Sequence, residues 1–274
     1  PFVHFGLQSK TKIDSLIIDW PNNTRTIKKN LAVNKTIKIG MNENKTQKTD
    51  LTKSKSNKIF FSNTTESFGI DYTHKENSFD DYEYQVLLPH KLSQMGPALA
   101  KSDINNDGLE DIFIGAANGF SPKLYLQNKE GKFYSINSNY WSKQSSFEDV
   151  DAIFVDVDND GNQDLYVVSG GNEHEDKNIN YTDRIYINDG NGNFYRGKIT
   201  GLIPESGSVV KASDYDNDGD MDLFVGGRHI PHQYPLPATS MILRNENGQL
   251  VNVTKEIAKE FEKLGMVTDA LWSD

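Results

Sequence analysis

The sequence contains no cysteine and no long apolar run. The absence of cysteine excludes disulfide bonds and thiolate metal sites, but it leaves the cellular compartment open. No apolar stretch approaches the roughly 20 residues that span a bilayer, and the first residues lack the basic leader and the apolar core of a signal peptide. We therefore expect no transmembrane segment. Because the sequence opens in what reads as the middle of a strand, we expect a piece of a longer protein.

Charges of opposite sign gather in different parts of the chain. Residues 1–58 hold twelve Lys and Arg against four Asp and Glu, although the net charge of the whole chain is −10. Thirteen acidic residues lie in three short loops of the later part. The acidic part is poorly suited to nucleic acid, and the early lysines lack the interleaved aromatic residues of a nucleic-acid surface. We predict no nucleic-acid partner.

The three acidic loops are copies of one repeat. They read SDINNDGLEDIFIGAANG, VDVDNDGNQDLYVVSGGN and SDYDNDGDMDLFVGGRH. Their first aspartates, Asp103, Asp156 and Asp214, are 53 and 58 residues apart, and a further 60 residues lead to Asp274. We interpret Asp274 as the first residue of a fourth copy.

Each copy predicts four short strands. A short apolar stretch leads into the acidic loop, an apolar strand follows it, and two further strands are joined by turns such as NDGNGN or NENG. Alternation with Asn-Gly and Asp-Gly turns indicates antiparallel hairpins, and four strands in about 50 residues are the unit of a propeller blade. The predicted fold class is all-β, a partial β-propeller of four-stranded antiparallel blades.

The chain divides into three predicted parts. Residues 1–40 read as a small β domain, residues 41–58 as a polar, Lys-rich linker, and residues 59–274 as the propeller segment. Within the last part, residues 59–96 are expected to supply outer strands or to lead into the propeller. Near its end, the stretch TKEIAKEFEKLG predicts one helix that Thr254 caps.

Each acidic loop follows the pattern D-x-[DN]-x-D-G-x-x-D. Side-chain oxygens at positions one, three, five and nine, a backbone carbonyl at position seven and a glycine at position six would wrap a hard cation that takes six to eight oxygens. We therefore predict about three Ca²⁺ sites. The predicted side-chain ligands are Asp103, Asn105, Asp107 and Asp111, then Asp156, Asp158, Asp160 and Asp164, then Asp214, Asp216, Asp218 and Asp222. The predicted backbone ligands are Leu109, Asn162 and Asp220.

Other interpretations of these loops are weaker. A single copy is also typical of a polar turn, but three copies in one strand context favour a metal site. Magnesium prefers a smaller octahedral site and retains its water. The loops are not EF-hands, because Ile114, Val167 and Val225 replace the glutamate at position twelve, and a strand follows in place of a helix.

The repeats resemble the FG-GAP or VCBS repeat family, the calcium-bearing blades of integrin-type β-propellers. The segments DIFIGAANG and DLFVGG stand where that family has its Phe-Gly strand. The first forty residues resemble the ASPIC/UnbV domain, through HFGL at residues 4–7 and IDSLIIDWPNN at residues 13–23. The resemblance implies a bacterial protein that is extracellular or at the cell surface, associated with the outer membrane.

The links between the second and third strands are expected to share the face opposite to the acidic loops. Two of these links are long, and long loops on a rigid scaffold commonly carry recognition. The candidate ligand-binding residues are Glu173, His174, Tyr181, Arg228, His229, His232 and Tyr234. They suit a glycan or a protein partner, while packing of these loops on neighbouring blades is an open alternative. Zinc at residues 173–175 is disfavoured, because adjacent loop residues seldom converge on one ion.

Familiar catalytic motifs are absent. The sequence has no H-E-x-x-H, no G-x-S-x-G and no phosphate-cradling glycine loop. The leading hypothesis is a non-catalytic, calcium-stabilised binding module of a larger surface protein. Two alternatives stay open. One is a polysaccharide-degrading enzyme, since some propeller enzymes draw their residues from several blades, and the other is a structural spacer in a surface assembly.

Overall fold

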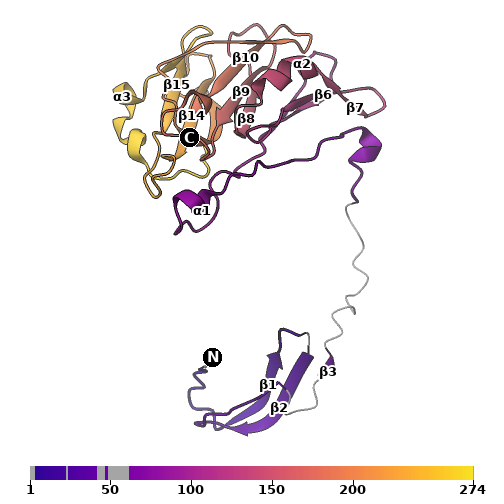
Figure 1. Ribbon diagram of the computed structural model, residues 1–274, viewed down its shortest axis with the longest axis vertical. Coiled ribbons are helices and arrows are strands. Elements are labelled where there is room, and N and C mark those ends of the chain that lie inside the picture. The colour runs from indigo at the N-terminus through magenta and orange to yellow at the C-terminus, as the bar shows by residue number, and fades with distance from the viewer. Residues whose placement is uncertain (1–3, 23, 42–46, 49–61, 274) are drawn as a thin grey trace. The chain divides into compact units, whose positions relative to one another are not determined.

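The structure is a computed structural model that describes residues 4–22, 24–41, 47–48 and 62–273. The chain forms two compact units, Pro1–Asn63 and Thr64–Asp274 (Figure 1). Asp274, the predicted start of a fourth copy, and most of the predicted linker lie outside the described residues.

The first unit is a small antiparallel sheet. β1 (Lys12–Asp19) pairs with β2 (Thr24–Ala32), and β3 (Gln47–Lys48) pairs with the other edge of β2. Trp20 follows β1 and donates from its indole Nε1 to Thr26 Oγ1 at 2.9 Å, where Thr26 is fully buried. This bond ties the turn after β1 to β2, so the tryptophan has a structural, hydrogen-bonding role.

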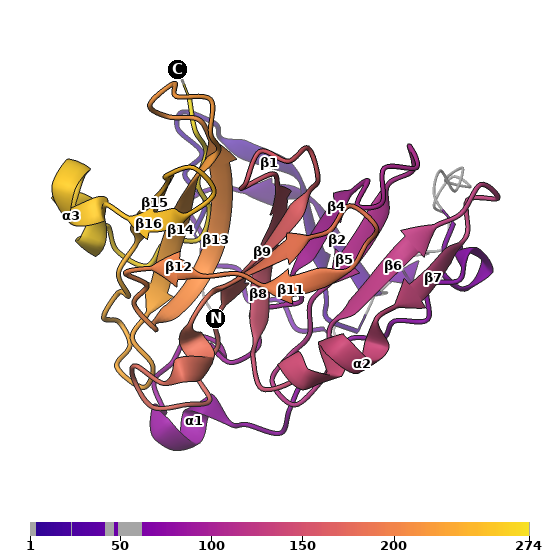
Figure 2. The same cartoon turned by 90° about the horizontal axis from the view of Figure 1, so that it is seen from above.

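The second unit contains three sheets, one for each repeat, in which four consecutive strands pair antiparallel in chain order (Figure 2). The strands of blade 1 are β4 (Leu99–Ser102), β5 (Asp111–Ile114), β6 (Lys123–Gln127) and β7 (Phe133–Ile136). Those of blade 2 are β8 (Asp149–Val155), β9 (Asp164–Ser169), β10 (Arg184–Asn188) and β11 (Phe194–Arg196). Those of blade 3 are β13 (Ser206–Ser213), β14 (Asp222–His229), β15 (Met241–Asn245) and β16 (Leu250–Asn252). This architecture confirms the predicted all-β partial propeller.

One strand departs from the four-strand pattern. β12 (Ile199–Thr200) follows blade 2 in the chain but pairs in parallel with β16 at the outer edge of blade 3. It therefore covers an edge whose backbone groups would otherwise lack partners in the sheet.

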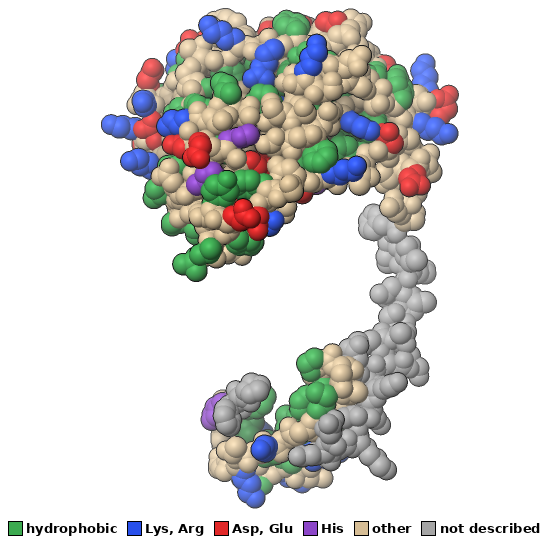
Figure 3. Space-filling model, in the orientation of Figure 1, with side chains coloured by type: hydrophobic (Ala, Val, Ile, Leu, Met, Phe, Trp, Pro, Cys, Tyr) green, Lys and Arg blue, Asp and Glu red, His purple; other side chains and the backbone are tan. Residues whose placement is uncertain are grey.

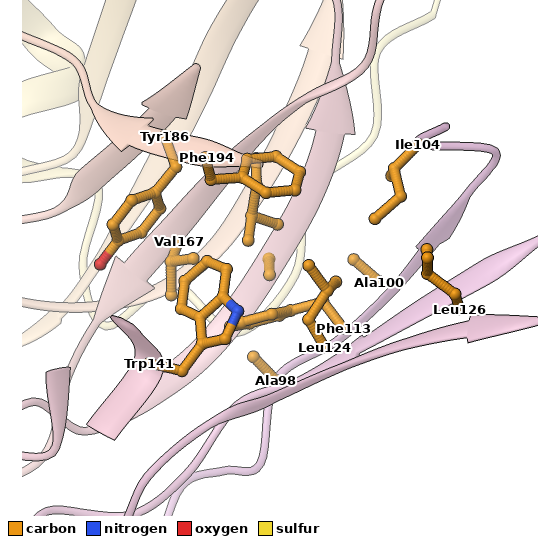
Figure 4. Packing of buried hydrophobic residues seen from close by; sticks show 12 residues of the cluster. Ala98, Ala100, Ile104, Phe113, Leu124, Leu126, Trp141, Val167, Tyr186 and Phe194 are labelled. Atoms are coloured by element: carbon orange, nitrogen blue, oxygen red, sulfur yellow. The ribbon is translucent and has the colours of Figure 1, made fainter. Parts of the chain in front are cut away.

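The apolar core lies between the sheets. Between blades 1 and 2, Trp141 packs against Phe113, Tyr186 and Phe194, with ring centroids 5.5, 5.2 and 6.0 Å away (Figure 4). A second buried cluster, which includes Val168 of blade 2, joins blades 2 and 3. Because each sheet is packed on its neighbour in this way, the loops at the ends of the blades are held at fixed positions relative to one another.

Short helices occupy the links. Between blades 1 and 2 they are α2 (Ser138–Trp141) and η2 (Ser142–Gln144), and η3 (Ile179–Tyr181) lies within blade 2, between β9 and β10. The predicted single helix near the end is broken into α3 (Thr254–Ile257) and η4 (Lys259–Lys263) at Ala258, which has φ −151° and ψ 58°. Ala258 is buried against blade 3. Thr254 does not cap the helix, because its hydroxyl accepts the N–H of Ile242 in β15 at 2.8 Å.

The segment before blade 1 forms no strand between residues 62 and 97, so it does not supply the outer strands that were one expectation for it. It carries η1 (Glu66–Phe68) and α1 (Asp81–Tyr84) and runs along one side of the propeller (Figure 1). We call residues 70–93 the strap. Tyr72 donates its hydroxyl to the carbonyl of Gly115, just after β5, at 2.7 Å. The strap thus lies against a link between second and third strands. We call these links the variable loops, and their end of the blades, opposite to the acidic loops, the variable-loop end.

Candidate functional site

Each acidic loop connects the first two strands of its blade. Positions four and six have left-handed backbone conformations, which asparagine and glycine tolerate best. At position four, Asn106, Asn159 and Asn217 have φ between 57° and 60°, and at position six, Gly108, Gly161 and Gly219 have φ between 85° and 98°. The three loops therefore share one sharply turned backbone.

The aspartate at position one closes the loop by accepting backbone N–H groups. Asp103 accepts from Asp107 and Gly108 at 3.1 and 2.8 Å. The same two bonds recur at Asp214 in the third loop, at 3.1 Å each, and Asp156 accepts from the glycine of the second loop at 3.0 Å. These bonds draw the backbone around the carboxylate, so the turn is formed by the loop's own residues.

The acidic side chains of two loops converge. In each, one oxygen from the aspartates at positions one, three and five lies within 4.8 Å of the others. The two triplets are Asp156, Asp158 and Asp160, and Asp214, Asp216 and Asp218. In the first loop position three is Asn105, whose amide donates to Asp107 Oδ2 at 3.2 Å, so an amide replaces one charge. Two triplets can hold a metal ion, and the first loop offers a donor set of lower charge.

Asp156 shows that the second loop suits a cation. Its Oδ1 atom is buried and has no hydrogen-bond partner in the described part of the chain, a costly state for a charged oxygen. Burial, followed by the charge of Asp160, raises the pKa of Asp158 above its ordinary value. Oxygen ligands of this type and number fit a hard divalent cation, which would remove both penalties.

The aspartate at position nine has a role that the ligand prediction did not include. Asp164 is fully buried, and its Oδ2 and Oδ1 accept the N–H groups of Val157 and Asn188 at 3.0 and 2.8 Å. The same two bonds recur at Asp111 and Asp222, at 2.8 to 3.2 Å. Burial raises the pKa of Asp164 to about 6, against the effect of these bonds. Position nine therefore ties each loop to the third strand of its own blade.

Three of the predicted ligand-face residues are buried. Tyr181 is 1% exposed, and its hydroxyl lies 2.9 Å from the carbonyl of His174. Arg228 is 9% exposed and donates to the carbonyl of Met266 at 3.3 Å. His229 is fully buried, and burial lowers its pKa to about 4. These side chains hold the variable loops in place and offer no surface to a ligand.

Of the remaining predicted residues, Glu173, His232 and Tyr234 contact the strap. Asn77 of the strap donates to Glu173 Oε1 at 3.1 Å. His174 Nε2 lies 3.0 Å from the amide nitrogen of Asn118, so this imidazole points to a different partner from Glu173. In the described residues the groups that converge as metal ligands are the two Asp triplets, and residues 173–175 are not among them.

His232 and Tyr234 are brought together with a part of the strap that the sequence prediction assigned no binding role. The ring of His232 stacks on Tyr84 with centroids 4.4 Å apart, and Phe79 stacks on the other two at 5.2 and 6.2 Å. The backbone N–H of Tyr234 donates to Gln85 Oε1 at 3.3 Å. The density of aromatic residues in FDDYEY, residues 79–84, was the available sequence signal.

Two carboxyl groups at this end of the blades are strongly perturbed. Glu148 is 2% exposed, and burial, followed by the charge of Glu173, raises its pKa to about 9. Burial also raises the pKa of Glu173 to about 7. Glu148 Oε2 accepts the N–H of Asn118 at 2.7 Å, while its Oε1 has no hydrogen-bond partner among the described residues. The buried position therefore favours the protonated form of Glu148.

Two family models match the chain. The model of the FG-GAP-like repeat matches residues 103–167 and 156–225, which begin at the first aspartates of the first and second acidic loops and include the third. The model named ASPIC and UnbV matches residues 1–48, which include the small sheet. The chain carries FG-GAP-like repeats and an ASPIC/UnbV domain. No curated protein matches it.

The second unit exposes apolar side chains around α1. Tyr84, Val86 and Leu87 are 57%, 77% and 91% exposed, and Leu236, two residues after Tyr234, is 49% exposed. Hydrophobic side chains are visible in the region of α1, at the lower left of the upper body in Figure 3. No helix in the described residues is both long and apolar enough to cross a membrane. The exposed apolar side chains lie next to the stacked rings of Tyr84 and His232.

Proposed function

We propose that the chain is a calcium-stabilised β-propeller module of a larger protein at the bacterial cell surface, and that it binds a glycan or a protein. The FG-GAP-like repeats and the ASPIC/UnbV domain support an extracellular propeller-like module. The observation that carries the calcium part is the unpartnered, buried Asp156 Oδ1 in a triplet whose geometry recurs in the third loop.

The residues that would hold the ions follow the repeat. Positions one, three, five and nine of each loop supply side-chain oxygens, and the carbonyls of Leu109, Asn162 and Asp220 complete the three sites. A bound Ca²⁺ supplies positive charge to carboxylates that otherwise repel one another and joins residues of a whole loop through one centre. The hydrogen bonds of position one already shape the loop for this purpose.

Calcium binding is tested by calorimetric titration of the chelator-treated chain, with magnesium as the comparison ion. We expect about three Ca²⁺ per chain and weaker binding of Mg²⁺. A matched pair of variants is Asp158→Asn, at a proposed ligand, and Asp189→Asn, at an exposed aspartate in the turn after β10. Asp158→Asn should remove or weaken one site, and Asp189→Asn should remove none. Absence of calcium heat in the unaltered chain would contradict the proposal.

The recognition surface we propose is centred on His232, Tyr234 and Tyr84. Stacked and exposed aromatic rings next to amide and carboxylate groups suit sugar rings or an apolar protein surface. A glycan array and a co-purification experiment distinguish the two partner classes. Glycan binding that Tyr84→Ala abolishes would support recognition by this surface, and binding that persists in that variant would place it elsewhere. A structural spacer would bind no glycan and would be recovered with an assembly partner.

A second candidate function is polysaccharide cleavage. The observation that favours it is the Glu148–Glu173 pair, because a carboxylic acid that stays protonated near neutral pH beside a second carboxyl group is typical of a general acid. Incubation with a glycan panel tests it. Depolymerisation that Glu148→Gln abolishes would support the enzyme, and binding without product would support the module.

A further inference from the structure

We infer that the calcium loops of neighbouring blades are coupled, so that filling one loop raises the affinity of the next. This inference rests on the proposed calcium function. It concerns four residues that are positioning residues and not ligands: Asn106, Asn159, Asn188 and Asn245. Each donates a side-chain hydrogen bond to an acidic loop of a neighbouring blade. Asn106 and Asn159 donate to the following loop, and Asn188 and Asn245 donate to the preceding loop. Both kinds of bond occur between blades 1 and 2 and between blades 2 and 3.

An exposed bond joins each loop to the next. Asn106, at position four of the first loop, donates from Nδ2 to Asn162 Oδ1 at 2.8 Å, and Asn162 donates in turn to Asp160 Oδ2 at 2.8 Å. Asn159, at position four of the second loop, donates to Asp220 Oδ1 of the third. In both cases a position-four amide reaches position seven of the following loop, whose carbonyl is a proposed ligand.

A buried bond makes the same connection from the following blade. Asn188, at the end of β10, donates from Nδ2 to the carbonyl of Ile104 in the first loop at 2.8 Å. Asn245, at the end of β15, donates to the carbonyl of Val157 in the second loop at 2.7 Å. Both asparagines are 1% exposed, so a lost partner would leave a buried donor unsatisfied. Each of these loops is therefore fastened to the blade after it.

The buried bonds form a continuous path through position nine. Val157 accepts from Asn245 through its carbonyl and donates its N–H to Asp164 Oδ2. Asp164 Oδ1 accepts the N–H of Asn188, whose side chain reaches the carbonyl of Ile104. A chain of hydrogen bonds thus runs from the first loop through the second to blade 3, and every member is a backbone group, a buried carboxylate or a buried amide.

This path provides a physical means of coupling. A loop that binds an ion loses internal motion, and the bonds extend that order to the next loop, which then has less freedom to lose when it binds. The effect must be reciprocal between the two sites, and couplings of this kind typically change an affinity by about 5- to 150-fold. We therefore expect positive cooperativity in calcium binding.

The first test disables the second loop and measures calcium binding at the first and third loops. In Asp158→Asn/Asp160→Asn the second loop exchanges two carboxylate ligands for neutral amides, which bind Ca²⁺ more weakly, and calorimetry of the full chain then reports mainly the first and third loops. We expect the remaining sites to bind Ca²⁺ at least about 5-fold more weakly than in the unaltered chain. Unchanged affinity at those sites would overturn the coupling and leave the calcium function standing. An unaltered chain that binds no calcium would overturn both.

The second test addresses the asparagines and carries its own control. Asn106→Gly/Asn159→Gly removes both exposed bonds and keeps a residue that tolerates the left-handed backbone. Asn217→Gly makes the same change at position four of the third loop, where φ is 60° and, among the described residues, the side chain donates to no other loop. We expect the double variant to lower the Hill coefficient for Ca²⁺ toward one and Asn217→Gly to keep it. Equal Hill coefficients in the two variants would overturn the assignment to these residues.

Discussion

At the acidic-loop end of the blades one pair of hydrogen bonds is repeated three times, whereas at the variable-loop end each blade is held by different partners. The aspartates at position nine make the repeated bonds. At the other end, Asp149 pairs with Arg184 inside blade 2, while Asp81 of the strap accepts from Asn172 of the same blade at 2.8 Å. The repeat thus specifies one end of the propeller segment, and a segment outside the repeat completes the other end.

The largest loss of stability should come from breaking the buried pair of Arg184 and Asp149 at the variable-loop end. Arg184 and Asp149 are 1% and 0% exposed, and Asp149 would be left as an unpaired buried charge. We expect Arg184→Met to lower the free energy of unfolding by about 3 to 5 kcal/mol in urea denaturation. The control is Arg244→Met, whose partner Glu246 is at the surface and which should cost at most about 1 kcal/mol. Equal losses would contradict the contrast.

At the acidic-loop end, two aspartates of one loop should respond differently to calcium. Asp164→Ala leaves the N–H groups of Val157 and Asn188 without their acceptor, so we expect a loss of about 3 kcal/mol even in chelator, and a larger loss with calcium because a proposed ligand is also removed. Asp158→Asn should destabilise the protein only when calcium is present, because its carboxylate is exposed and repelled by its neighbours. If Asp164→Ala, like Asp158→Asn, cost no stability in chelator, position nine would have no metal-independent role.

The variable-loop end should also respond to pH. The pKa of Glu148 is raised to about 9 in the folded chain, above its ordinary value in the unfolded chain. Between those values the folded state holds a proton that the unfolded state has lost, so stability falls as pH rises. We expect the free energy of unfolding of Glu148→Gln, measured in chelator, to rise relative to that of the unaltered chain by at least about 1 kcal/mol between pH 6 and pH 8.5. The same change at the exposed Glu130, Glu130→Gln, should leave the pH dependence of the free energy of unfolding unaltered. An equal rise in that variant would refute the assignment of the pH dependence to Glu148.

The smallest effect on stability should come from the exposed surface of the strap. Tyr84 is 57% exposed, so we expect Tyr84→Ala to change the free energy of unfolding by less than about 1 kcal/mol. Its partner binding should fall sharply while its melting curve stays close to that of the unaltered chain. A large loss of stability would show that the stacked rings serve the fold of the strap.

The repeated parts of the fold were predictable from the sequence. The spacing of Asp103, Asp156 and Asp214 and the alternating strands sufficed for the four-stranded blades, because one local pattern decides every copy. The position-nine bonds could not be predicted, since each joins residues that are 7 to 24 positions apart through the folded blade. The division at residue 40 stays a prediction, and β3 (Gln47–Lys48) pairs with β2 beyond it.

The variable-loop end could not be derived from local pattern. Arg228 and His229 look like surface residues in a polar loop, but β14 extends to His229 and buries both. Tyr84 and Gln85 meet His232 and Tyr234 across about 150 residues of sequence, through contacts that no periodicity encodes. The prediction of one continuous helix over residues 254–265 was wrong. The helix is interrupted at Ala258, because the burial of this residue against blade 3 prevails over helix propensity.

The thermal unfolding of the chain in calcium and in chelator tests the central claim most directly. Ions that bind the folded loops and not the unfolded chain stabilise by about 2.7 kcal/mol per independent site at a hundred times the dissociation constant. We predict that chelation lowers the melting temperature by several degrees and that added Ca²⁺, but not an equal concentration of Mg²⁺, restores it. A melting temperature that is the same in calcium and in chelator would contradict the account.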